Sequence, residues 1–106
     1  FKKEFGGLLY ALRAKWPEVR VVWSPVLEFT RAPAMPGLLG RILEVRAQEM
    51  NRMGARLCNE RGAVPAPRLP ITDPQAGFSD DGFHASVAGY RAWAEHLAPL
   101  VLEDRP

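Results

Sequence analysis

Apolar side chains recur at helical spacing in the first, middle and last parts of the chain. The first set consists of Phe5, Leu8, Leu9, Leu12 and Trp16. The second set, which predicts a long helix, consists of Leu39, Ile42, Leu43, Ala47, Met50, Met53, Gly54 and Leu57. The third set consists of Tyr90, Trp93, Ala94, Leu97 and Val101. Such spacing places one apolar stripe along each helix, and we expect each stripe to face a core. Pro17 and Gly62 should end the first two helices.

Short apolar stretches that are rich in β-branched residues separate these helices. The run from Val19 to Val26 predicts a short, largely buried strand, in which Pro25 marks the point where ladder pairing should stop. The segment from Ala63 to Ala66 could form an edge strand. The loop from Leu27 to Gly37 contains two prolines and follows the carboxyl end of the first strand, where open α/β sheets tend to build their sites.

The order helix, strand, helix, weak strand, helix predicts the α/β class, with parallel strands between two helical layers. Two strands alone do not bury both faces of a parallel sheet. We therefore expect further strands beside Val19 to Val26, supplied by a missing segment or by a partner chain.

Composition narrows the possible partners. The chain has 14 basic and 12 acidic side chains, a formal net charge of +2, and charges that are interspersed along its 106 residues. A nucleic-acid surface would gather its basic residues on one face, so we expect no nucleic-acid partner. No apolar run approaches the roughly 18 to 20 residues that cross a bilayer, so we expect no membrane span. The single cysteine, Cys58, favours a reducing compartment such as the cytoplasm and should be a small buried apolar residue.

The segment from Ser79 to Ser86 carries the chemistry of the chain. Its sequence, Ser-Asp-Asp-Gly-Phe-His-Ala-Ser, sets Asp81 three residues before His84. A carboxylate that accepts a hydrogen bond from one imidazole nitrogen fixes the tautomer, so that the other nitrogen can accept a proton from a hydroxyl group. Asp80, four residues before His84, is the other carboxylate that could bind the imidazole. Spacing alone also fits a surface Asp-His pair or a helix-capping aspartate.

Other reactive groups have structural explanations. Ser24 lies near a strand end but lacks the glycine-flanked elbow of a nucleophile, while Ser79 and Ser86 suit turn and cap positions. His96 lies in the middle of the last predicted helix, where we expect a surface or helix-terminus histidine. We expect no metal site, because two histidines and one cysteine do not supply a ligand set. No phosphate-cradling glycine loop is present, so no nucleotide cofactor is implied.

Residues 81–86, followed by Gly89-Tyr90 and a helix rich in Trp and Leu, resemble the last motif block of the SGNH, or GDSL-type, hydrolases, which reads approximately Asp-Gly-x-His-Pro-Ser-x-x-Gly-Tyr. The other segments that resemble the C-terminal half of this family are Lys15-Trp16-Pro17, Val21 to Pro25, and Asn59 to Gly62. The resemblance therefore covers nearly the whole chain.

By this resemblance, Asp81 is the orienting carboxylate and His84 is the general base. Ser86 would be the N-cap of the last helix, and Tyr90 would be a packing residue. Ala85 departs from the proline that is common in the family, which removes some loop stiffness and no reacting group. The substrates would be small acyl or acetyl esters, hydrolysed through an acyl-enzyme. Trp23, Phe83 and the loop from Leu27 to Gly37 could line the acyl pocket.

In this family the nucleophilic serine and the glycine and asparagine that stabilise the oxyanion precede the region that matches here. We therefore expect residues 1–106 to be the C-terminal part of a flavodoxin-like three-layer α/β/α domain, incomplete by itself. The chain also begins at Phe1 and enters a helical pattern almost at once. Its partner would be an N-terminal segment or chain that carries the serine, and without it the chain should be inert. The alternative is a non-catalytic α/β interaction subunit or a degenerate hydrolase half.

Overall fold

The computed structural model describes residues 1–35 and 37–103. The elements along the chain are α1 (Lys2–Lys15), β1 (Val22–Trp23), the 3₁₀ turn η1 (Phe29–Arg31), α2 (Gly37–Arg61), β2 (Val64–Pro65), α3 (Pro74–Gly77) and α4 (Val87–Leu102). All three helices predicted from apolar spacing are present, and the weak edge strand predicted at 63–66 is confirmed as β2.

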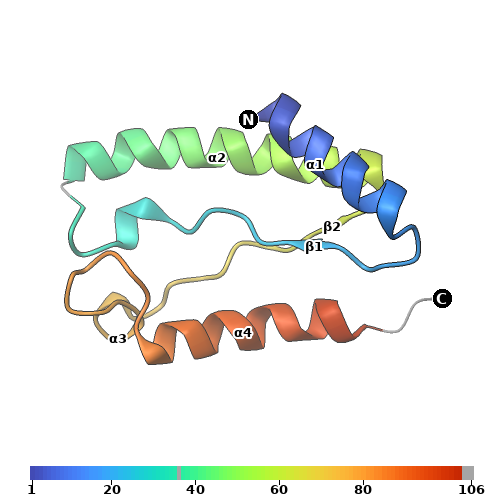
Figure 1. Cartoon of the computed structure of the whole chain (residues 1–106). Coiled ribbons are helices and arrows are strands. Elements are labelled where there is room, and N and C mark those ends of the chain that lie inside the picture. The colour runs from blue at the N-terminus through green and yellow to red at the C-terminus, as the bar shows by residue number, and fades with distance from the viewer. Residues whose placement is uncertain (36, 104–106) are drawn as a thin grey trace.

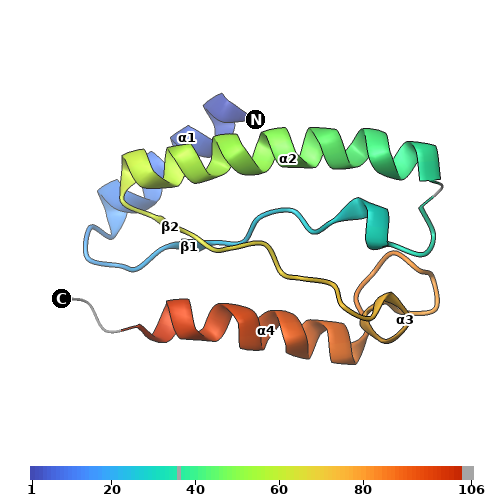
Figure 2. The same ribbon diagram turned by 180° about the vertical axis from the view of Figure 1, so that it is seen from behind.

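The elements form three layers, and the pair of strands is the middle one. Figure 1 shows α1 and α2 on one side of the strands and α4 on the other, and Figure 2 shows the same arrangement from behind. β1 and β2 are parallel, with Val22 opposite Val64 and Trp23 opposite Pro65. The predicted class, α/β with parallel strands between helical layers, therefore agrees with the described part of the chain.

The first strand is shorter than predicted, and two residues explain where its carboxyl end lies. Pro25 has no N–H to donate to a ladder, as the sequence indicated. The side chain of Asn51 on α2 then binds both backbone groups of Val26, since Val26 N–H donates to Asn51 Oδ1 (2.8 Å) and Asn51 Nδ2 donates to the Val26 carbonyl (3.1 Å). A side chain thus takes the place of a neighbouring strand at the point where β1 would have continued.

Gly62 ends α2 in the way that the sequence predicted. It has a φ of +73°, and the N–H of Ala63 reaches back to the carbonyl of Cys58 (2.8 Å), which is the closing bond of a glycine-terminated helix. The guanidinium of Arg13 on α1 donates to the carbonyls of Arg61 and Gly62. The carbonyls at the end of α2 are therefore satisfied by the neighbouring helix.

The core is small and lies where α1 and α2 meet the strands. Its buried residues are Leu9, Leu57, Cys58 and Ala63, with Phe5, Val21 and Trp23 packed against them. Cys58 is fully buried, as predicted, and burial raises the pKa of its thiol.

The expectation that each apolar stripe faces a core is wrong for many of its members. The exposed ones are Leu8, Trp16, Leu39, Ile42, Met50, Met53, Tyr90, Ala94 and Val101. The physical reason is a mismatch of length, because a 25-residue helix is about 37 Å long whereas two strand residues span about 7 Å. The two strands of the described chain cover only part of the helices.

Gly54 permits the closest contact between a helix and a strand, and its substitution gives a test of the core. A Cβ at Gly54 would overlap the six-membered ring of Trp23. We expect Gly54→Ala to lower the free energy of unfolding by about 1 to 3 kcal/mol, although alanine favours helices. Gly7→Ala is the matched control, since a Cβ there meets nothing within 4 Å and should stabilise α1 by roughly 0.5 to 1 kcal/mol. Chemical denaturation measures both, and equal effects would contradict this packing.

Candidate active site

The loop between α3 and α4 is a tight hairpin that carries Asp81 and His84. Phe78 and Ala85 form an antiparallel bridge at its base, and the N–H of Ser79 donates to the carbonyl of His84 (2.8 Å). Figure 1 shows this loop rising from α3 and α4 toward η1. The hairpin thus brings a segment near the end of the chain against the loop that follows β1.

Gly82 is required at the tip of this hairpin. Its φ is +68°, a conformation that residues with a Cβ adopt only at a cost. A Cβ at this position would also lie 2.7 Å from the backbone nitrogen of Ala34. The N–H of Ala34 donates to the Gly82 carbonyl (3.0 Å), so the two loops are joined through backbone atoms.

Both carboxylate oxygens of Asp81 accept hydrogen bonds. Oδ1 accepts from the N–H groups of Phe83 (2.8 Å) and His84 (2.9 Å) and from the hydroxyl of Ser79 (2.9 Å). Oδ2 lies 2.5 Å from Nδ1 of His84. The bond to the His84 side chain, followed by those from the Phe83 and His84 amides and Ser79, holds the pKa of the Asp81 carboxyl far below its usual range. The group therefore stays ionised in mild acid.

One ring nitrogen of His84, Nδ1, is bound to Asp81, and the other, Nε2, is left available. Because Nδ1 donates to Asp81, Nε2 is the nitrogen that can accept a proton, and within residues 1–35 and 37–103 it has no hydrogen-bond partner. The side chain is 70% exposed, and the ring of Phe83 meets it edge-on with 5.4 Å between ring centres. Asp80, the rival carboxylate, makes no hydrogen bond to His84 in the described chain.

Ser86 begins α4 immediately after this loop, as the sequence predicted. Its hydroxyl accepts from the N–H of Gly89 (3.0 Å) and donates to the carbonyl of Ala76 (2.5 Å). The N–H of Ser86 donates to the carbonyl of Gly77 (3.0 Å). These bonds fix the start of α4 against α3 and so set the position of the hairpin between them.

The serine side chains of the chain make hydrogen bonds to groups other than the His84 ring. Ser24 accepts from the indole N–H of Trp93 (2.9 Å), Ser79 donates to Asp81, and Ser86 caps α4. His96 donates from Nε2 to the carbonyl of Pro67 (2.6 Å), which ties α4 to the segment after β2. None of these hydroxyl groups is bonded to Nε2 of His84.

A cavity of about 210 Å³ adjoins the imidazole. Its lining includes His84, Phe83, Tyr90 and Trp93 and, from the loop after β1, Val26, Leu27, Glu28 and Ala32. The cavity therefore includes Phe83 and part of the loop from Leu27 to Gly37 that the sequence indicated. Trp23 is not among its lining residues, because its ring packs on Gly54 and Phe5 in the core.

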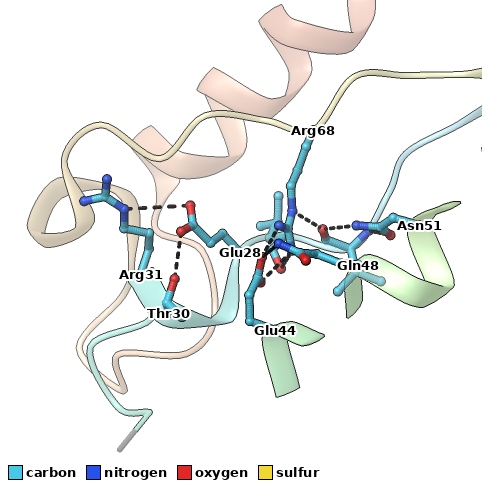
Figure 3. Close-up of polar contacts among 9 residues, drawn as sticks. Glu28, Thr30, Arg31, Glu44, Gln48, Asn51 and Arg68 are labelled. Atoms are coloured by element: carbon cyan, nitrogen blue, oxygen red, sulfur yellow. Dashed lines mark hydrogen bonds and ion pairs between the residues drawn. The ribbon is translucent and has the colours of Figure 1, made fainter. Parts of the chain in front are cut away.

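The loop after β1 is held by Arg68, a residue that the sequence analysis missed. Figure 3 shows its guanidinium between this loop and α2. Nε donates to the carbonyl of Val26 (2.8 Å), Nη2 donates to the carbonyl of Leu27 (2.9 Å), and the group pairs with the carboxylate of Glu44 on α2. Arg68 stands in a proline-rich stretch without periodic pattern, so no local signal pointed to it.

Comparison with known proteins gives the family. The model of the GDSL-like lipase/acylhydrolase family matches residues 1–97. The chain belongs to this family. No curated protein and no solved structure gave a match. Membership in the GDSL-like lipase/acylhydrolase family indicates a hydrolase with a lipase or esterase type of activity.

Two absences concern residues 1–35 and 37–103 of this GDSL-like chain. In these ranges no helix has both the length and the apolar character to cross a membrane. In the same ranges, His, Cys, Asp and Glu side chains do not gather in groups of three or more that could hold a metal ion.

Proposed function

We propose that this chain supplies the histidine and aspartate of a Ser-His-Asp ester hydrolase that acts on small acyl or acetyl esters. The observation that carries the proposal is the bond between Asp81 Oδ2 and His84 Nδ1, which leaves Nε2 available beside a cavity in a GDSL-like chain. A histidine held in this way can act as general base and then as general acid.

The reaction uses each of these groups in turn. His84 Nε2 accepts the proton of a serine hydroxyl while the serine oxygen attacks the ester carbonyl, and the imidazolium then gives that proton to the leaving alcohol. The acyl-enzyme forms at this stage. His84 next accepts a proton from water, whose oxygen attacks the acyl carbon, and returns the proton to serine as the carboxylic acid leaves. Asp81 stays ionised and stabilises the imidazolium in both halves.

The serine would come from a polypeptide stretch outside residues 1–106. Two observations support this part of the proposal. Ser24, Ser79 and Ser86 are each engaged in structural hydrogen bonds. The described sheet has two strands, and apolar residues along α2 are exposed, including Ile42. A segment that added strands to β1 would cover such residues and complete a flavodoxin-like three-layer domain, of which this chain would be the C-terminal part.

Hydrolysis of p-nitrophenyl acetate tests the function. The assay compares the chain alone with the product of its full reading frame, and each with its His84→Ala variant. We expect the chain alone to match its variant, and the full product to hydrolyse the ester in a reaction that His84→Ala abolishes. Absence of hydrolysis by the full product would contradict an enzyme and favour the non-catalytic interaction subunit.

A further inference from the structure

A second cavity, of about 170 Å³, lies next to the one that contains His84. The two share Leu27, Ala85 and Trp93 in their linings. The rest of the second cavity is lined mainly by small or apolar residues of the loop after β2, α3 and α4, among them Leu69, Ile71, Ala76, Ala88, Gly89 and Ala92. An apolar space thus begins one residue away from the imidazole.

The walls of this second cavity are fixed by contacts within the chain. α3 and α4 approach so closely that a Cβ at Gly89 would overlap the carbonyl of Gly77. The indole of Trp93 is held by its bond to Ser24 (2.9 Å). Asp73, a polar group at the cavity, caps α3 by accepting from the N–H of Ala76 (3.2 Å). Contacts within the chain therefore fix part of the cavity wall, while Ala88 and Ala92 on α4 are exposed. The Asp73 carboxylate already has a backbone partner.

We infer that this second cavity binds the acyl chain of the ester, and that it accommodates about six carbon atoms. This inference rests on the proposed function and names the substrate that suits it. An apolar cavity of about 150 Å³ in another protein holds one benzene molecule, which sets the capacity at about six carbons. Each methylene that enters should tighten binding by about fourfold, the equivalent of about 0.8 kcal/mol, until the space is full.

Binding of neutral amides tests the inference without requiring turnover. N-methylacetamide, N-methylbutanamide, N-methylhexanamide and N-methyldecanamide are titrated by calorimetry into the protein expressed from its full reading frame. Affinity should rise about fourfold per methylene as far as the hexanamide and then stop rising. An affinity that is independent of chain length, or that rises steadily to the decanamide, would overturn the inference.

A pair of substitutions on α4 assigns the binding to this cavity. Ala88→Leu places a larger side chain in the cavity and should remove at least tenfold of the hexanamide affinity. Ala94→Leu makes the same change on the same helix outside the lining and should leave the affinity unchanged. Ala92→Val is a milder filling variant for use if Ala88→Leu does not fold. Equal affinities in folded filling and control variants would overturn the inference.

The outcomes also separate this inference from the proposed function. Chain-length-dependent binding that Ala88→Leu removes, in a protein that hydrolyses no ester, would support the cavity and contradict the enzyme. Hydrolysis that depends on His84 but shows no preference for chain length would support the enzyme and contradict the cavity.

Discussion

Asp81→Asn is expected to lower kcat for ester hydrolysis by on the order of ten-thousand-fold in the product of the full reading frame. The asparagine oxygen can still accept from Phe83, His84 and Ser79, the partners of Oδ1, so the hairpin should keep its shape. The amide NH₂, however, would face Nδ1 of His84 as a donor. The ring proton would then move to Nε2, which could no longer accept a proton from serine.

Asp80→Asn is the matched control for this experiment. Asp80 is the neighbouring carboxylate and makes no hydrogen bond to His84 in the described chain, so kcat should stay within about twofold. Nitrogen chemical shifts of the His84 ring provide a second readout, because the tautomer should change in Asp81→Asn alone. A loss of kcat in Asp80→Asn equal to that in Asp81→Asn would contradict the assigned role of Asp81.

Arg68→Met is expected to lower the free energy of unfolding by about 3 kcal/mol, the largest effect on stability that we expect from a single charged residue of the chain. The side chains of Arg68 and Glu44 are 25% and 13% exposed, so removal of the arginine leaves a carboxylate that is largely shielded from water. The carbonyls of Val26 and Leu27 also lose a charged donor. Methionine retains the length of the aliphatic part, so the loss reports chiefly on the polar contacts.

Arg31→Met provides the comparison. Arg31 pairs with Glu28 at 3.8 Å, and these side chains are 52% and 36% exposed. Figure 3 shows both pairs. Because exposed ion pairs contribute between zero and about 1 kcal/mol, this variant should unfold at nearly the denaturant concentration of the unchanged chain. Urea denaturation measures the unfolding midpoint of each variant. Equal midpoints for Arg68→Met and Arg31→Met would refute the contribution assigned to Arg68.

Sequence reasoning succeeded where the cause was local. A proline after β1, Gly62 after α2 and Ser86 before α4 each act on backbone groups within a few residues, so their effects can be predicted from neighbouring positions. The spacing of Asp81 and His84 is local as well, and it placed the two side chains within reach of each other. The motif resemblance had already selected Asp81 over Asp80, and the hairpin supplies the physical reason, because the N–H groups of Phe83 and His84 turn toward Asp81.

The features that could not be predicted depend on residues far apart in the chain. Asn51 shortens β1 by binding Val26, and Arg68 joins Val26 and Leu27 to Glu44 across a long stretch of sequence. No periodic pattern encodes such pairs. The exposure of many stripe residues was unforeseeable for a related reason, because spacing predicts which side of a helix is apolar and not how much of its length another element covers.

The backbone contact between Ala34 and Gly82 has an evolutionary consequence. It makes the position of the imidazole depend on the main chain of a different loop, so the constraint falls on position 82 and not on the side chain at position 34. Any Cβ at position 82 would strike the Ala34 main chain, and no change of side chain at position 34 relieves a collision with a backbone atom. Loss of that glycine in a related protein would therefore shift the loop that carries His84, and with it the proposed general base.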